Sequence, residues 1–111
     1  MKEYEVNKLL TLLIINKVQS FRNSYDLTKV LAWKFGIIEF VDLIDSLLQS
    51  ELIAKVVING LSHYNMTLKG VDYLKANEET LRLEIYKLYP LQIEFIDSLW
   101  QRDDVGVVNN G

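Results

Sequence analysis

The sequence contains no cysteine, one histidine, one proline and five glycines in 111 residues. Without cysteine there is no disulfide framework, no thiolate zinc site and no cysteine nucleophile. His63 alone excludes a site with several histidine ligands. The glycines are scattered, so no glycine-rich loop could cradle a nucleotide phosphate. We therefore expect no catalytic residues, no metal and no cofactor, and the chain is not expected to be an enzyme.

Long hydrophobic runs are also missing. The apolar stretch at residues 9–15 is far shorter than the ~20 residues that a helix needs to cross a bilayer. Glu3 and Glu5 precede it and no small-residue cleavage site follows, unlike in a signal peptide. With 50% hydrophobic and 24% charged residues, the composition is typical of one globular domain. We expect a cytoplasmic protein with no membrane contact.

The sequence also lacks an excess of basic residues, because its net charge is −3. Residues 1–36 carry six basic and three acidic residues, a net charge of +3, and residues 37–111 have a net charge of −6. Proteins that bind phosphates non-specifically normally carry a clear basic surplus. Any nucleic-acid binding must therefore depend on a local patch.

Apolar periodicity predicts helices over about residues 3–19, 24–35 and 38–50. Ser24 is the expected N-cap of the second helix, and Gly36 its left-handed C-cap. The first helix is apolar on most sides, because Leu12, Ile14 and Ile15 widen its apolar face. Such a helix is covered either by the core of its own domain or by a partner subunit.

The strongest local signal follows the third helix. Two strand-like runs at residues 52–58 and 61–65 flank Asn59-Gly60, a pair that favours a type I′ turn. Thr67 is the expected cap of a fourth helix, and a separate helical stretch is predicted at 78–89. Pro90 predicts a break near Tyr89, followed by a last helix to about Arg102.

This order of elements is typical of a winged helix-turn-helix domain, in which the hairpin forms the wing. The segments LLQSELI at 47–53 and TLKGVDYL at 67–74, with Asn59-Gly60 and Tyr64 between them, resemble winged-helix regulators of the PadR and MarR type. The segments NKLL at 7–10 and NKV at 16–18 also resemble a small winged-helix family whose function is not established. These motifs are specific for fold and say little about function.

The expected fold class is therefore mostly α with a small β-hairpin, a winged helix-turn-helix with additional C-terminal helices. We expect a winged-helix domain at residues 1–76, with its wing at about 52–66. C-terminal helices at 77–103 and a flexible tail at 104–111 complete the expected organisation. One departure from the resemblance is Glu51, because relatives usually place glycine there, which adopts positive φ without strain.

The second departure concerns the third helix, which enters the major groove of DNA in winged-helix regulators. Residues 37–51 contain four acids and no base, and a polyanion repels such a surface. The helix face that would meet DNA is predicted to carry Glu39, Asp42, Ser46 and Gln49. Contact with double-stranded DNA would then depend on residues of the second helix and the wing: Arg22, Lys29, Lys34, Lys55, His63 and Tyr64.

The C-terminal helices carry two apolar stripes, which exceed what a three-helix core is expected to cover. PadR-like and MarR-like proteins dimerise through terminal helices, so the resemblance implies a homodimer here. Tyr89 and Trp100 are expected near the centre of that interface. The alternative is that these helices pack back onto the first helix of the same chain. The predicted interface residues are Leu81, Ile85, Leu88, Tyr89, Phe95, Ile96, Leu99 and Trp100.

Two functions follow from these observations. The first is a dimeric, transcription-regulator-like protein that binds DNA through its second helix and its wing. The second is a winged-helix module that binds a protein partner and not DNA, because its third helix is acidic. A ligand sensor with a pocket under the C-terminal helices is a third and weaker alternative.

Overall fold

A computed structural model describes residues 1–17 and 23–100. These residues are mostly helical with one two-stranded antiparallel sheet, which confirms the prediction of a mostly-α fold with a small β-hairpin. The elements, in chain order, are α1 (Glu3–Asn16), α2 (Ser24–Phe35), α3 (Phe40–Gln49), β1 (Ile53–Ile58), β2 (Leu61–Met66), α4 (Leu68–Leu88), the 3₁₀ turn η1 (Pro90–Gln92) and α5 (Ile93–Trp100).

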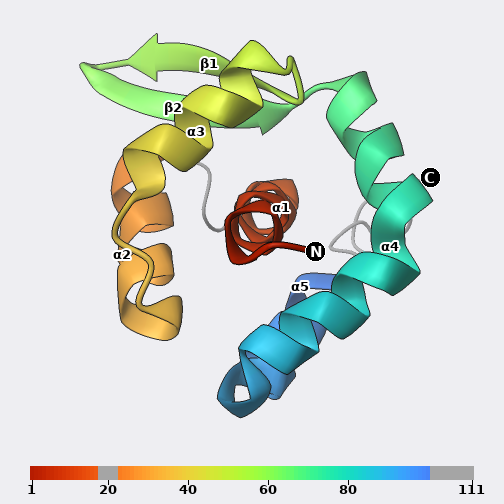
Figure 1. Cartoon of the computed structure of the whole chain (residues 1–111). Helices are drawn as coiled ribbons and strands as arrows, with labels where there is room; N and C mark the ends of the chain where they lie inside the picture. Colours follow the sequence, from red (N-terminus) through yellow and green to blue (C-terminus); the bar gives the residue numbers. More distant parts are fainter. Residues whose placement is uncertain (18–22, 101–111) are drawn as a thin grey trace, which may run out of the picture.

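Helix α1 occupies the centre of the molecule, with the other helices and the hairpin arranged around it (Figure 1). Every residue from Val6 to Ile15 except Lys8 is buried. Leu12, Ile14 and Ile15 are at most 2% exposed. The chain's own core therefore covers this helix on nearly all sides, and no partner subunit is needed to explain its apolar surface.

The caps of α2 were predicted to within one residue. Asn23 and not Ser24 is the N-cap, since its side-chain oxygen accepts a hydrogen bond of 2.8 Å from the Asp26 N–H. Ser24 is the first helical residue. The prediction for Gly36 is confirmed, because its φ of +67° ends the helix in the left-handed region.

Helix α3 ends without glycine, as the sequence implies. Glu51 adopts the left-handed conformation with a φ of +61°. Its N–H donates to the Leu48 carbonyl at 3.1 Å, and the Leu52 N–H donates to the Leu47 carbonyl at 3.0 Å. This pair of hydrogen bonds is a Schellman motif with glutamate at the position that glycine usually holds.

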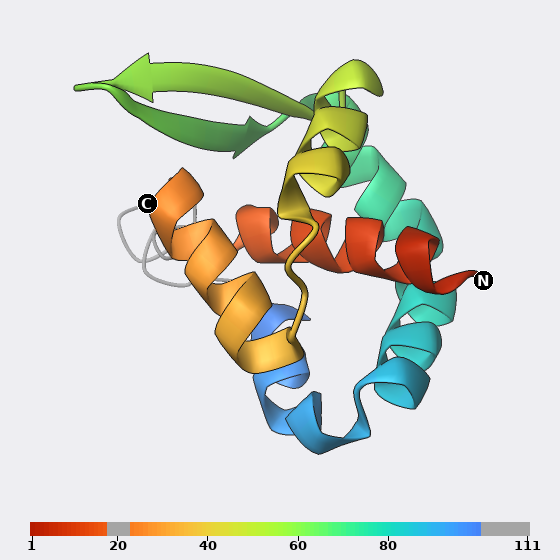
Figure 2. The ribbon, with the colours of Figure 1, turned by 60° about the vertical axis from the view of Figure 1, so that its left-hand side comes forward.

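The hairpin confirms the strongest sequence signal. Asn59 and Gly60 both have positive φ, at +51° and +77°, as a type I′ turn requires. Ile58 pairs with Leu61 beside the turn, and Ile53 pairs with Met66 at the base. Figures 1 and 2 show the hairpin projecting past the helices, with the turn at its far end.

Helix α4 corrects one prediction. It is one continuous helix of 21 residues, where the sequence suggested separate stretches before 75 and after 77. Residues 75–77 include no glycine or proline that would end a helix. The predicted boundary between residues 76 and 77 therefore lies inside a helix, and residues from both sides of it belong to one core.

After α4 the chain turns back toward α2, as Figure 2 shows. Pro90 begins η1, so the predicted break near Tyr89 is confirmed. The Phe35 ring at the end of α2 contacts the rings of Tyr89 and Phe95, at centroid distances of 5.0 and 5.8 Å. Residues 101–111, which include the predicted end of the last helix and the predicted tail, lie outside the described residues.

A buried polar contact joins α1 to the end of α4. The Tyr89 hydroxyl donates to the Asn7 side-chain oxygen at 2.5 Å, and Asn7 is buried. Burial raises the pKa of Tyr89 to about 12, and the negative charge of Glu3 adds to that shift. Because the Tyr89 hydroxyl is the donor, this hydrogen bond forms only while the tyrosine is neutral.

This contact predicts a loss of stability at alkaline pH. In the unfolded chain a tyrosine ionises near pH 10, so Tyr89 stabilises the fold fully below about pH 10. That contribution is lost as the pH rises toward 12. We expect Tyr89→Phe to lower the free energy of unfolding by about 1–2 kcal/mol at pH 8, because Asn7 loses its donor.

The free energy of unfolding, measured with urea, should differ less between the wild type and Tyr89→Phe as the pH rises from 10 to 12. A difference that stays constant across this range would contradict the role given to Tyr89.

Candidate interaction site

Lys29 lies on the outer surface of α2 between two exposed aromatic rings. Its ammonium group is 5.1 Å from the centroid of Tyr25 and 5.1 Å from that of Trp33. The three residues are spaced by four, so they follow one line along the helix. Trp33 is 78% exposed. Lys29 was predicted as a contact residue and its two aromatic neighbours were not, although their spacing of four residues is visible in the sequence.

The other predicted cations are dispersed. The Lys34 ammonium lies 5.1 Å from the Phe95 ring, at the end of α2 that faces α5. Lys55 is exposed on β1. His63 is half-buried on β2, where its Nδ1 lies 3.0 Å from the Leu61 carbonyl and its backbone bridges to Asn23. These groups therefore belong to three different elements, the end of α2, β1 and β2.

Tyr64 was predicted to contact DNA, and the structure corrects this prediction. The side chain is 7% exposed and belongs to the core. Side chains alternate between the two faces of a strand, and Tyr64 shares the inner face with Met66 and Ile53. Arg22, another predicted contact, lies outside the described residues.

The exposed surface of α3 combines acids with apolar side chains. Ile38 and Val41 are 73% and 63% exposed. Gln49 is exposed as predicted, whereas Ser46 is half-buried. We use the name α3 face for the exposed residues Ile38, Glu39, Val41, Asp42 and Asp45.

Among the described residues, the acids of the α3 face have no ion-pair partner. None of the ion pairs within residues 1–17 and 23–100 involves Glu39, Asp42 or Asp45. The Tyr4 hydroxyl donates to the Asp42 backbone carbonyl at 3.4 Å and not to its carboxylate. The α3 face therefore offers three unpaired carboxylates beside two exposed aliphatic side chains.

The predicted dimer interface is largely inside the fold. Leu81, Ile85, Ile96 and Leu99 are at most 2% exposed, because α4 and α5 pack against α1. Packing onto the first helix, the alternative left open by the sequence, therefore accounts for these four residues. The remaining predicted interface residues pack against the same core and are partly buried: Leu88, Tyr89, Phe95 and Trp100.

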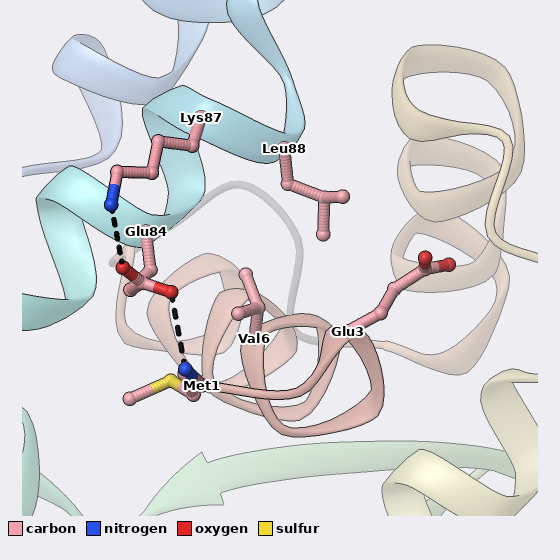
Figure 3. A pocket seen from close by; sticks show the side chains of 6 residues that line it. All are labelled: Met1, Glu3, Val6, Glu84, Lys87 and Leu88. Atoms are coloured by element: carbon pink, nitrogen blue, oxygen red, sulfur yellow. Dashed lines mark hydrogen bonds and ion pairs between the residues drawn. The ribbon is translucent and has the colours of Figure 1, made fainter.

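A small pocket lies between the start of α1 and the end of α4 (Figure 3). Its Glu84 carboxylate lies 3.4 Å from the Met1 amino group and 3.3 Å from Lys87 Nζ. The hydrogen bond from Lys87, together with the Met1 amino group, lowers the pKa of Glu84. The charged groups of this pocket are already paired with one another. The pocket therefore gives no support to the ligand-sensor alternative.

Within residues 1–17 and 23–100 no helix is long and apolar enough to cross a membrane. The same residues contain no group of three or more acids or histidines arranged to hold a metal ion. Comparisons with protein-family models, curated proteins and solved structures found no match to this chain.

Proposed function

We propose that this chain is a winged-helix module that binds a protein partner through its α3 face. The order of helices and hairpin supports a winged-helix interpretation, in which α3 is the element that would enter the major groove. The observation that carries the proposal is the composition of the α3 face. It has three unpaired carboxylates, two exposed aliphatic side chains and no base.

This surface is unfavourable for DNA. Phosphates repel carboxylates, and arginine or lysine supplies most phosphate contacts and readout of guanine. Exposed aliphatic side chains beside charges are suited instead to a partner that offers apolar and basic groups. The proposed partner is therefore a protein surface with exposed aliphatic side chains and at least one lysine or arginine.

The acids of α3 are the proposed barrier to DNA binding. Replacing them with lysine should therefore allow the protein to bind DNA. We expect Asp42→Lys/Asp45→Lys to bind duplex DNA at low salt, and we expect the wild type to show no saturable binding under the same conditions. The gain should be at least about tenfold in affinity and should decrease with salt, since each new phosphate contact adds to the salt dependence. Fluorescence anisotropy with a random-sequence duplex measures both.

The matched control is Asp72→Lys/Glu79→Lys on α4, because both residues are exposed and the change in net charge is identical. If the control gains as much affinity as the α3 variant, net charge and not the α3 face governs DNA binding. An α3 variant that still fails to bind would show that the acids are not the barrier.

A second candidate function is contact with duplex DNA through α2 and the hairpin. The specific observation in its favour is Lys29 between two exposed aromatic rings, together with the exposed Lys55. This candidate requires that Lys29→Glu/Lys34→Glu weakens duplex binding at low salt by about tenfold or more. Lys69→Glu/Lys75→Glu on α4 makes the same charge change at exposed positions and is the control.

A further inference from the structure

The hairpin is the chemical complement of the α3 face. The hairpin, residues 53–66, contains one lysine, one histidine and no acid, and it follows a segment with four acids and no base. Val56, Val57 and Ile58 on β1 are 46–60% exposed, and Leu61 on β2 is 37% exposed. Lys55 and Val57 lie on the side of the hairpin that also carries Tyr64, and Val56, Ile58 and Leu61 lie on the other side. We use the name hairpin surface for the exposed pair Lys55 and Val57.

These two surfaces do not satisfy each other within one chain. None of the ion pairs formed by the described residues joins Lys55 to an acid of α3. In Figures 1 and 2 the hairpin extends past α3, so that its turn lies far from that helix. Lys55 with Val57, and the acids of the α3 face with Val41, are therefore both exposed and not paired with each other in the described residues.

The distance between the apolar and the charged side chain is also similar on the α3 face and on the hairpin. Val41 and Asp45 lie one turn apart on α3, about 6 Å along the helix axis. Lys55 and Val57 lie on the same side of β1, about 7 Å apart along the strand. Val57 can therefore contact Val41 while Lys55 lies opposite Asp45.

From this match we infer that the partner of the α3 face is the hairpin of a second copy of this chain. The inference rests on the proposed function, because it uses the same face and identifies its occupant. A two-fold axis makes the contact reciprocal, so each chain gives its α3 face and its hairpin surface once. The assembly then closes as a dimer, and both the apolar contact and the ion pair occur twice.

The reciprocal arrangement allows a charge-swap experiment on the full chain. Asp45→Lys places lysine opposite Lys55, and Lys55→Glu places glutamate opposite Asp45, so each variant alone has two repulsive contacts per dimer. We expect each variant to raise the Kd of the homodimer at least about tenfold in sedimentation-equilibrium measurements. Mixing the two variants puts opposite charges at both contacts and should restore a dimer.

Asp72→Lys and Lys75→Glu on α4 serve as single-charge controls and should dimerise as the wild type does. A wild type that stays monomeric would overturn the inference, as would a dimer that neither variant weakens. Failure of the mixture to recover would also overturn it, because direct pairing of residues 45 and 55 requires recovery. The proposed function fails separately, if the wild type binds duplex DNA at physiological salt.

Discussion

Gly70→Ala should lower the free energy of unfolding by about 3 kcal/mol, although alanine is the better helix former by about 1 kcal/mol. Gly70 lies in the first turn of α4 and is buried against the segment that joins α3 to β1. A Cβ atom at this position would lie 2.1 Å from the Leu52 carbonyl oxygen, which belongs to the backbone and cannot rotate away. The backbones of two elements would have to separate.

Three further hydrogen bonds hold the same contact together. The Thr67 hydroxyl donates to the Glu51 carbonyl at 2.6 Å and accepts from the Gly70 N–H at 3.0 Å. The Thr67 N–H donates to the Leu52 carbonyl at 3.2 Å. Displacing Leu52 therefore disturbs the N-cap of α4, the end of α3 and the base of the hairpin together.

Urea unfolding measures the loss, with Lys75→Ala at an exposed position of the same helix as the control. The control should change the free energy of unfolding by no more than about 0.5 kcal/mol. A Gly70→Ala protein as stable as the wild type would show that α4 does not approach Leu52 this closely.

Leu12→Ala is expected to cost about 3 kcal/mol, within the range for emptying a fully buried leucine site. Leu12 is 0% exposed. In a helix at the protein surface, the side of the helix that carries Leu12 would be polar. The side chain fills a space enclosed by other elements of the same chain, so its removal leaves a cavity in the monomer.

Asn16→Ala provides the comparison, because Asn16 follows Leu12 by one turn and is exposed. We expect the asparagine change to stay within about 0.5 kcal/mol in the same unfolding experiment. If the cost of Leu12→Ala depended on protein concentration, a partner subunit and not the chain's own core would cover this side of α1.

The features that could be predicted from sequence depend on short-range chemistry. Asn59-Gly60 determines the turn because both residues tolerate positive φ, and Gly36 ends α2 for the same reason. Pro90 determines the break after α4 because it restricts the preceding residue. Each of these residues acts on its immediate neighbours, so no tertiary information was needed.

The errors have a different origin. Asn23 and Ser24 are both good N-caps, and only the surrounding structure selects between them. The continuity of α4 through residues 75–77 depends on packing along its whole length, which overrides weak local preference. Tyr64 lies on the inner face of β2, and alternation alone does not identify which face of a hairpin packs on the core.

The candidate site was predicted in part. The excess of acids on α3 was visible in the sequence, and Glu39 and Asp42 are exposed as expected. Exposure of Ile38 and Val41 was not predicted, because an apolar residue next to an inner face is normally assigned to the core. Because of these two side chains, the α3 face is apolar as well as charged.

The most direct test of the central claim is a titration of the wild-type protein against a random-sequence DNA duplex. Fluorescence anisotropy would follow the titration at about 50 mM and about 150 mM salt. The account predicts no saturable binding at either salt concentration, because the α3 face repels phosphates. Saturable binding at low salt that weakens steeply at the higher concentration would contradict it and would favour contact through α2 and the hairpin.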